Sequence, residues 1–432
     1  MKLSTENYKG TRDFYPEDMR LRNYLFETMK KVVTAFGYEE YDGPMIESID
    51  LYRAKTGEEI VGNQVYDFID KGKRHVSIRP EMTPTLARMV AKKSRELPRP
   101  IRWFSIPNLW RYEQPGRGRL REHWQLNVDV FGEKSFTAEV EILQVAVAIL
   151  KEFGAKKEQF SISISNRKIL DSFFLNRLNL DPNKSQSLSK LLDKKNKISE
   201  EEFSTLAMQI VDSKEKLSLI QEFLNANLET IGSIAKLENV ELEEFLKVFS
   251  SLEGIGLDAN IHFDPSVIRG FDYYTGTIFE IFDTNPENKR SLYGGGRYDN
   301  LIGIFSNEEL SGIGFGLGDV TLENFLRTHG LLPELQKQNT IYFPILGDGL
   351  YPKVLELSTK VRDLGFSCEV SLSAAKLTKH ISVAEKKQHA ILLIFGTEEQ
   401  EKNLITIKHL HKRTQETVPL ENLGSKLREF SA

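Results

Sequence analysis

The stretch VIRGFDYYTGTIFEIF, residues 267–282, contains four side chains able to bind a polar ligand, all within six consecutive residues. They are Arg269, Asp272, Tyr273 and Tyr274. The residues around them are apolar, which is typical of a buried strand. An ordinary cross-strand aromatic pair would explain the two tyrosines without a ligand. Because side chains alternate along a strand, only one tyrosine could face a site fully, and we expect it to be Tyr274. Asp272 is expected to anchor the loop.

A second set of polar residues occupies the loop RYEQPGRGRLRE. Its charged members are Arg111, Arg117, Arg119 and Arg121, beside Glu113 and Glu122. Guanidinium groups and glycines suit phosphate binding, because one supplies a fixed fork of donors and the other lets backbone approach. A solvated hairpin is the alternative. In the strand that follows, Gln125, Asn127 and Asp129 alternate with apolar residues. Three polar side chains on one face need partners if that face is buried, which favours a pocket.

Two shorter segments could contribute to the same site. SIRPEMTPT contains Glu81 and Thr83, which could bind a ligand or could cap the helix predicted for PTLARMVAKK. The segment GGGR, with Gly294, Gly295 and Arg297, permits close approach to a flat ligand, although a glycine run more often forms a turn.

The elements that must position these residues form an interrupted first domain. A helix is predicted in PEDMRLRNYLFETMKKVVTAFG, with Gly37 as its stop signal. Strands follow in VYDFID, HVSIRP, IRWFSIPNLWRYE and HWQLNVDVFG, the last two antiparallel across QPGRGRLRE. Another helix ends at Gly154. Residues from about 155 to 258 are expected to form a helical insertion, after which strand and glycine patterns return up to residue 326.

A second domain is predicted after a linker at residues 327–339. Strand and helix patterns alternate beyond it, so residues 340–432 are expected to form a small α/β domain with a largely parallel sheet. The 432 residues suit two or three domains. Net charge is -4 with a single cysteine, Cys368, and no apolar run approaches the length of a membrane span. We therefore expect a soluble cytoplasmic protein that does not enter a membrane.

These motifs together resemble one enzyme family. RYEQPGRGRLREHWQLNVDVFG resembles motif 2 of class II aminoacyl-tRNA synthetases in the histidyl form, and RGFDYYTGTIFE resembles the histidine-binding signature of histidyl-tRNA synthetases. KGTRDFYP, RPEMTP and GGGRYDNL match that family in order, and GYEEYDGPMIES resembles motif 1, with Pro44 as its proline. The resemblance implies an α+β fold, with a catalytic domain on an antiparallel sheet and a helical insertion, followed by an α/β anticodon-binding domain. It also implies a homodimer.

The resemblance implies a reaction in two steps. The carboxylate of L-histidine attacks the α-phosphate of ATP, giving histidyl-adenylate and pyrophosphate, and histidine then passes to the 3′ end of histidine tRNA. Arg111 and Arg269 are implied as the catalytic α-phosphate ligands, with Mg²⁺ on the outer phosphates. The implied imidazole ligands are Asp129 and Tyr274, one on each nitrogen.

The remaining implied roles follow by position. The implied histidine-binding residues are Glu81, Thr83, Arg119, Gln125, Asp129, Tyr273 and Tyr274. The implied ATP-binding residues are Arg111, Glu113, Arg269, Gly294, Gly295, Arg297 and Gly316. The candidates for tRNA binding are Arg117 near the active site and Lys376, Lys379, Lys386 and Lys387 in LTKHISVAEKKQ.

Three positions depart from the family pattern. Thr321 stands where motif 3 has an arginine that contacts adenine and the γ-phosphate, Gly116 replaces a glutamine of the motif 2 loop, and Asp129 replaces a longer glutamate. The departure at Thr321 keeps one alternative open, a histidine-sensing paralogue such as the regulatory subunit of ATP phosphoribosyltransferase. A remoter alternative is a nucleotide-binding module without a tRNA role.

Overall fold

The computed structural model describes residues 2–54, 62–195, 198–257, 260–268, 273–288, 290–306, 308–335 and 340–431. The chain divides into two compact units, residues 1–333 and residues 334–432, and each is treated by itself. Among the described helices, none combines the length and the apolar character that a membrane crossing requires.

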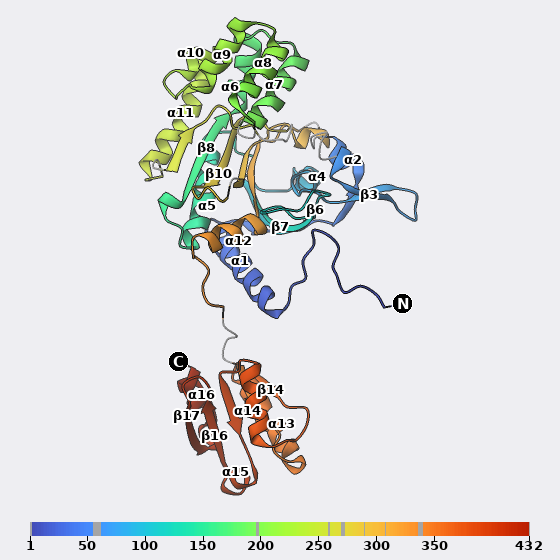
Figure 1. The fold of residues 1–432 in the computed structure, drawn as a ribbon, viewed down its shortest axis with the longest axis vertical. Coiled ribbons are helices and arrows are strands. Elements are labelled where there is room, and N and C mark those ends of the chain that lie inside the picture. The colour runs from blue at the N-terminus through green and yellow to red at the C-terminus, as the bar shows by residue number, and fades with distance from the viewer. Residues whose placement is uncertain are drawn as a thin grey trace. The chain divides into compact units, whose positions relative to one another are not determined.

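The first unit is built on a nine-stranded sheet (Figure 1). In spatial order its strands are β1 (Glu39–Glu40), β5 (Ile101–Ser105), β7 (Glu122–Phe131), β12 (Gly312–Gly318), β11 (Ser291–Arg297), β10 (Thr277–Asp283), β8 (Phe160–Asn166) and β9 (Ile261–Phe263), with β6 (Asn108–Trp110) paired to β7. Only the terminal pairs β1–β5 and β8–β9 are parallel among the described strands. The prediction of an antiparallel sheet is confirmed.

Helices cover one face of this sheet. The long helix α1 (Pro16–Ala35) packs against α5 (Thr137–Glu152), and both bury apolar residues in the main core. Each is followed by a glycine with positive φ, Gly37 at +83° and Gly154 at +86°, as their stop signals predicted. The sheet region also contains α2 (Ile49–Arg53), α4 (Thr83–Lys93) and α12 (Asp319–Thr328).

A helical segment extends beyond one end of the sheet (Figure 1). It contains α6 (Arg167–Ser172), a π-helical turn (Phe173–Arg177), α7 (Pro182–Lys194), α8 (Glu200–Val211), α9 (Lys214–Leu224), α10 (Ile231–Ala235) and α11 (Asn239–Gly254). The side chains of Asp181, Ser199 and Ser213 cap α7, α8 and α9. Within the range expected to be helical, residues 160–166 instead form β8 in the main sheet. FSISISN alternates apolar and serine side chains, which is a strand period.

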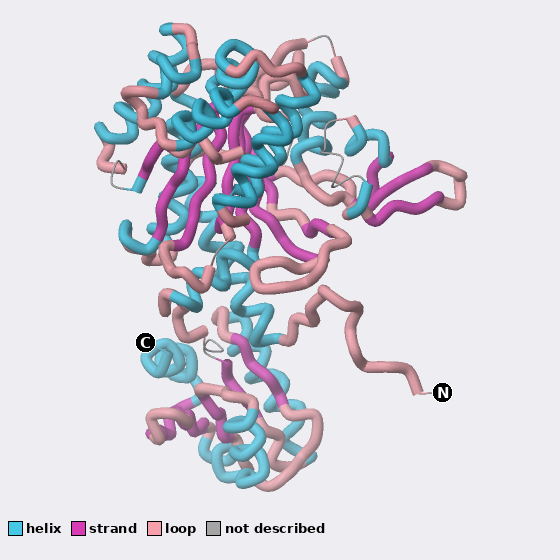
Figure 2. Tube along the Cα trace, turned by 45° about the horizontal axis from the view of Figure 1, so that its top comes forward, coloured by secondary structure: helices cyan, strands magenta, loops and turns pink. Residues whose placement is uncertain are grey.

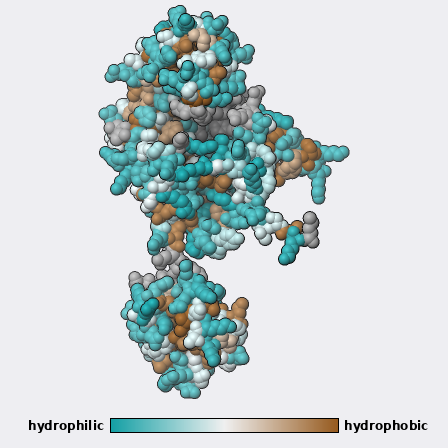
Figure 3. Space-filling model, in the orientation of Figure 1, coloured by the Kyte–Doolittle hydropathy of each residue, from teal (hydrophilic) through white to brown (hydrophobic). Residues whose placement is uncertain are grey.

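A small three-stranded sheet projects from the first unit (Figure 2). Its strands are β2 (Ile46–Ser48), β4 (His75–Ile78) and β3 (Tyr66–Ile69), in that spatial order. Four of its apolar side chains are exposed, and Figure 3 shows brown surface on this projection. They are Met45, Ile46, Phe68 and Ile69, of which Ile69 is 62% exposed.

The second unit contains a five-stranded sheet. Its order is β14 (Ser367–Val370), β13 (Thr340–Phe343), β15 (Ile391–Ile394), β16 (Leu404–His409) and β17 (Thr414–Pro419), with helices α13 (Tyr351–Asp363), α14 (Leu377–Lys386), α15 (Thr397–Lys402) and α16 (Leu423–Ser431). The expectation of a largely parallel sheet is wrong. Two pairings are parallel, but β15–β16 and β16–β17 are antiparallel. A short turn joins β16 to β17 as a hairpin, whereas α15 lies between β15 and β16 in the chain.

Candidate active site

A polar groove is built where β7 lies beside β12. Gln125, Asn127 and Asp129 project from one face of β7, and the paired strand GIGFGLG places glycines against them. A Cβ atom on Gly314 would lie 2.2 Å from Asp129 Oδ1, and one on Gly316 would lie 2.7 Å from the Cδ of Gln125. Any larger residue at these positions would therefore collide with the polar side chains. The glycines leave the space in which a ligand can meet them.

The inner end of this groove is a pocket, called here the inner pocket. It is lined by Glu81, Thr83, Arg111, Gln125, Asn127, Asp129, Tyr273, Tyr274, Gly294, Tyr298, Gly314, Phe315 and Gly316. Every residue predicted to bind histidine lies here except Arg119. Asn127, Tyr298 and Gly314 were not assigned to the site from the sequence. The alternation of Asn127 with Gln125 and Asp129 was a signal for the first of these.

Asp129 and Glu81 are the two acids of the inner pocket, and each is only 3% exposed. The Tyr298 hydroxyl donates a hydrogen bond to Asp129 Oδ1, whereas the buried Oδ2 of Asp129 has no hydrogen-bond partner within the described residues. Burial raises the pKa of Asp129 to about 7, and the Tyr298 hydrogen bond opposes this shift. An N–H donor entering the pocket would satisfy Oδ2 and would favour the ionised carboxylate.

The tyrosine pair lies outside the strand that was predicted to carry it. β10 begins at Thr277, so Tyr273 and Tyr274 precede it and do not alternate across a sheet. Both line the inner pocket, with ring centroids 4.9 Å apart, and the expectation that only one could face it is wrong. The Tyr273 hydroxyl donates to Glu81 Oε2 at 3.2 Å.

Glu81 and Thr83 do not cap the following helix. The N-cap residue of α4 is Met82, which makes no side-chain capping bond. Glu81 is buried and Thr83 half-buried, and both side chains line the inner pocket instead. The helix begins here because Pro84 suits the first turn.

A second pocket, called the outer pocket, adjoins the first. It is lined by Arg111, Glu113, Gly118, Arg119, Leu120, His123, Gln125, Ser291, Leu292, Tyr293, Gly316, Gly318, Val320 and Thr321. Arg111, Gln125 and Gly316 belong to both pockets. Arg111 is therefore at their junction, held by a hydrogen bond from its Nε to the Pro80 carbonyl at 2.9 Å.

Arg119 lies in the outer pocket, contrary to its predicted place beside histidine. It forms an ion pair with Glu113, which is 7% exposed. The loop carrying Arg119 turns back at Gly118, whose φ of +74° favours glycine, and this turn directs the guanidinium toward Glu113. The pair places a positive group in the outer pocket without leaving the buried carboxylate unpaired.

His123 is an outer-pocket residue that the sequence reasoning missed. It lies two residues before Gln125, so the same strand alternation could have identified it. Burial lowers the pKa of His123 to about 3, and the nearby charges of Arg111, Arg12 and Arg119 lower it further. The imidazole is therefore an uncharged, flat ring at neutral pH.

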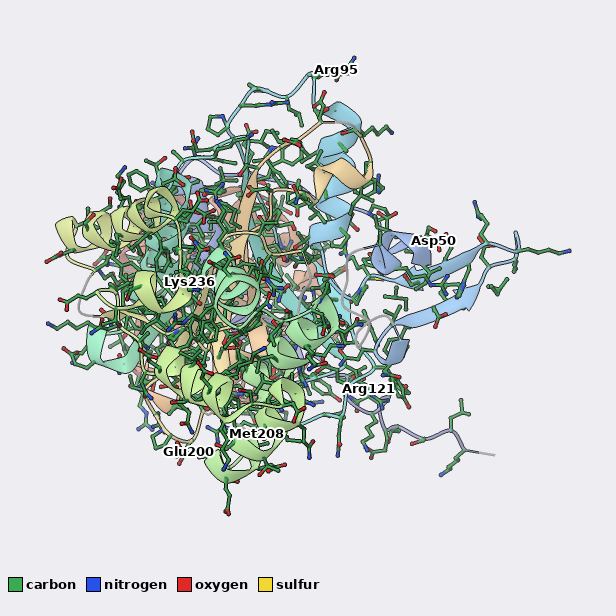
Figure 4. All side chains as sticks on the ribbon, turned by 90° about the horizontal axis from the view of Figure 1, so that it is seen from above. Asp50, Arg95, Arg121, Glu200, Met208 and Lys236 are labelled. Carbon is green, nitrogen blue, oxygen red and sulfur yellow. The ribbon has the colours of Figure 1, made fainter. Side chains whose placement is uncertain are left out.

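Arg121, labelled in Figure 4, serves the fold of this loop. Its guanidinium lies 4.0 Å from the centroid of the Tyr112 ring and donates to the Glu113 carbonyl at 3.1 Å and to the Tyr8 hydroxyl at 2.9 Å. It thereby connects the N-terminal segment to the loop.

Arg297 does not join the site, which corrects its assignment to ATP. Its five N–H groups all have partners: both oxygens of Glu139, the Ser311 hydroxyl, and the carbonyls of Glu133 and Ser135. Strand alternation is the reason, because Arg297 projects from the face of β11 that packs on α5. The guanidinium borders a larger cavity on that face, which is lined also by Phe245 of α11 and shares no lining residue with the pockets of the polar groove.

Gly295 lies on the same face of β11 as Arg297, the face that packs on α5. A Cβ atom there would lie 1.9 Å from the Gly314 carbonyl oxygen and 2.7 Å from Phe315 Cα, so glycine is needed for the approach of β11 to β12. Gly294 alternates with it and lines the inner pocket. Arg269 and Asp272 lie outside the described residues.

The predicted tRNA ligands are exposed. Arg117 is 55% exposed and contacts Asn288 at 3.1 Å and Glu287 at 3.4 Å. Lys376, Lys379 and Lys386 are exposed at spacings that place them along one face of α14, whereas Lys387 forms an ion pair with Glu369.

Comparison with known proteins identifies the family. Residues 10–320 match the family model for histidyl-tRNA synthetase, and residues 340–430 match that for the anticodon-binding domain. A histidine–tRNA ligase from Leptospira biflexa is 58% identical over 99% of this chain and 98% of its own, and one from Opitutus terrae is 34% identical over 98% of each. The crystal structure of histidyl-tRNA synthetase from Nostoc sp. PCC 7120 has the same fold, with a TM-score of 0.81 at 22% identity, covering 99% of this chain and all of that one.

The sequence and the fold are those of an aminoacyl-tRNA ligase, an enzyme that uses ATP, an amino acid and tRNA. Within that class, the chain belongs to the histidyl-tRNA synthetase family. The anticodon-binding match in the second unit opposes both the histidine-sensing alternative and a nucleotide-binding module without tRNA.

Proposed function

We propose that this protein activates L-histidine with ATP and transfers it to the 3′ end of histidine tRNA. In the first step, a histidine carboxylate oxygen bonds to the α-phosphorus of ATP, the bond to the bridging oxygen of the β-phosphate breaks, and pyrophosphate leaves. In the second, a terminal ribose hydroxyl attacks the histidyl carbonyl and AMP leaves. The observation that carries the proposal is the buried Oδ2 of Asp129 in the inner pocket, which has no hydrogen-bond partner among the described residues.

The inner pocket is the proposed histidine site. Imidazole has two distinct nitrogens, and Asp129 accepts from one of them while the Tyr274 hydroxyl serves the other. Glu81, Thr83 and Gln125 bind the α-amino group, and Tyr273 supports Glu81 through its hydrogen bond. A side chain unable to pair with these buried groups is rejected by about 10⁴-fold or more.

The outer pocket is the proposed ATP site. Arg111 lies where the two pockets meet, so it can reach the α-phosphate while the amino-acid carboxylate attacks. Arg269 is the second proposed α-phosphate ligand, from its sequence alone. Glu113 holds Arg119 in this pocket, and the neutral His123 ring is a proposed stacking surface for adenine.

Magnesium is proposed to arrive on the outer phosphates of ATP. Among residues that the structure describes, no group of three or more His, Cys, Asp or Glu side chains is arranged to hold a metal ion. The described side chains thus do not form a protein cage for Mg²⁺, and no step is assigned through it.

Other aspects of the proposal concern the whole chain. We propose a catalytic domain at residues 1–326 with a helical insertion, a linker at 327–339 and an anticodon-binding domain at 340–432. Exposed Met45, Ile46, Phe68 and Ile69 support a homodimer through the projecting sheet. The single cysteine, buried and unpaired, supports a cytoplasmic location.

The test is histidine-dependent exchange of labelled pyrophosphate into ATP, with purified full-length protein and no tRNA. Exchange should require histidine and should fail with the other amino acids, and Arg111→Ala should reduce it by at least 100-fold. Arg95→Ala, an exposed arginine labelled in Figure 4, is the control and should match the unmodified protein. Absence of exchange while histidine still binds by calorimetry would contradict the proposal.

A further inference from the structure

A third pocket adjoins the outer pocket at its end farthest from the inner pocket. It is lined by Arg117, Gly118, Glu287, Asn288, Arg290, Leu292, Thr321 and Asn324. Gly118, Leu292 and Thr321 line both, whereas none of its residues lines the inner pocket. The three pockets therefore form a continuous series in which a ligand of the outer pocket can extend past Thr321.

Arg290 is the cation placed beside Thr321. A Cβ atom built on Gly118 would lie 3.5 Å from Thr321 Cγ2 and 3.9 Å from Arg290 Cδ, so both side chains border the same point. Thr321 itself is short, and its hydroxyl donates to the Leu292 and Gly318 carbonyls at 2.7 and 3.0 Å. It carries no charge and its one donor is already engaged.

The guanidinium of Arg290 is available to a ligand. It is exposed and forms no hydrogen bond or ion pair with any residue that the structure describes. Among the described residues that line this pocket, the one acid is Glu287, which lies 3.4 Å from Arg117 in an exposed pair. Two guanidinium groups and one acid leave an excess of positive charge, which favours an anion with several oxygens.

We infer that Arg290 binds the outer phosphates of ATP, and the same groups in the departing pyrophosphate. In the related motif an arginine stands at the position of Thr321 and contacts the γ-phosphate. In this chain Arg290, the residue before β11, takes over that contact. Arg117, which lines the same pocket, assists. This inference rests on the proposed function, because it assigns part of the same ATP site.

The first experiment measures inorganic pyrophosphate binding to the full-length protein by calorimetry. Arg290→Ala should weaken it by about 10- to 100-fold, the usual effect of removing hydrogen bonds to a charged group, and Arg290→Lys should weaken it less. Arg327→Ala is the matched control, since this exposed arginine lies on α12 with Thr321 but pairs with Glu323. Equal binding by Arg290→Ala and the unmodified protein would overturn the inference.

The second experiment uses pyrophosphate exchange. Arg290→Ala should raise KM for ATP and for pyrophosphate by about tenfold or more, with KM for histidine within about twofold. Thr321→Arg, added to Arg290→Ala, should restore the affinity for ATP, because both positions border the same pocket. A double variant no better than Arg290→Ala would show that the two positions do not serve one subsite.

Two further outcomes separate the alternatives. If Arg290→Ala leaves exchange unchanged and raises only the KM for tRNA in aminoacylation, the pocket binds tRNA phosphate and the inference is wrong. If the unmodified protein shows no histidine-dependent exchange, the proposed function fails, while the pyrophosphate titration still decides the role of Arg290.

Discussion

Asp129 shows how one side chain can be unfavourable for stability and useful for binding. Burying an ionised carboxylate without full hydrogen bonding destabilises the folded state, and the raised pKa of Asp129, about 7, reflects this. The same Oδ2, to which no described residue donates a hydrogen bond, offers a strong acceptor to a ligand N–H group. The pocket therefore contains a buried hydrogen-bond acceptor to which the imidazole N–H of histidine can donate.

A pH dependence of stability follows from this carboxyl group. In the unfolded chain the pKa of an aspartate is near 4, so below about pH 4 Asp129 is protonated in both states and imposes no cost. As pH rises to about 7 the unfolded state loses the proton first, and the unliganded protein should lose up to about 4 kcal/mol of stability from this group. At pH 7 and above, the Tm of Asp129→Asn should therefore exceed that of the unmodified protein. The difference should shrink as the pH falls toward 4.

Thermal unfolding of the unliganded full-length protein at several pH values measures this difference. Asp50→Asn is the control, because Asp50 on α2 is exposed, as Figure 4 shows, and its substitution should give no such trend. Parallel Tm curves for Asp129→Asn and the unmodified protein would contradict the raised pKa.

Tyr274 should affect histidine far more than ATP. Removal of its hydroxyl by Tyr274→Phe leaves one imidazole nitrogen without its partner, so KM for histidine should rise about tenfold, while KM for ATP stays within about twofold. Pyrophosphate exchange with each substrate varied in turn measures both values. An equal rise in the two would refute the imidazole role of Tyr274.

At the scale of elements, strand β12 creates the pocket by lacking side chains. Its glycines lie against the polar face of β7, while Ile313 and Leu317 project into the core on the other face. The alternation of glycine and apolar residues along β12 thus gives a packed core on one face and an open groove on the other. The same alternation explains why Arg297 of β11 is structural.

An alanine substitution in β12 tests this arrangement. Gly314→Ala should reduce kcat/KM for histidine at least 100-fold, because its Cβ atom would lie 2.2 Å from Asp129 Oδ1, and its Tm should fall. Gly254→Ala is the control, since Gly254 ends α11 away from both pockets and a Cβ atom there would meet nothing within 4 Å. Similar activity of the two variants would refute the proposed role of the glycines.

At the scale of the whole molecule, chemistry and tRNA recognition are assigned to different units. The inner and outer pockets lie entirely in the first unit, whereas the exposed lysine face of α14 is in the second. Variants in the second unit can therefore change tRNA binding without changing amino-acid activation.

The triple variant Lys376→Ala, Lys379→Ala, Lys386→Ala should raise KM for tRNA in aminoacylation and leave pyrophosphate exchange unchanged. If each lysine contacts a phosphate, the slope of log affinity against log salt should fall by roughly 1 per lysine. Lys402→Ala is the control, because this exposed lysine of α15 pairs with Glu398. An unchanged salt slope would show that the three lysines do not contact tRNA phosphates.

The sequence by itself determined the antiparallel pairing of the strands that flank QPGRGRLRE, the two long helices ended by Gly37 and Gly154, and the polar face of β7. These features depend on local periodicity and on the backbone freedom of glycine, both of which are written in neighbouring residues. Motif resemblance indicated the family and, with it, the antiparallel sheet of the first unit. The alternation along β7 could also have identified His123 as a residue of the site, because it lies two residues before Gln125.

Only the tertiary structure decided which of the motif residues meet. Arg119 pairs with Glu113 in the outer pocket, Arg297 is held by Glu139, and both tyrosines reach the inner pocket because β10 begins after them. Arg290 and Thr321 are distant in sequence but border one pocket. Such contacts depend on which strands pair and on the direction a loop takes, and these are set by packing between segments that are remote along the chain.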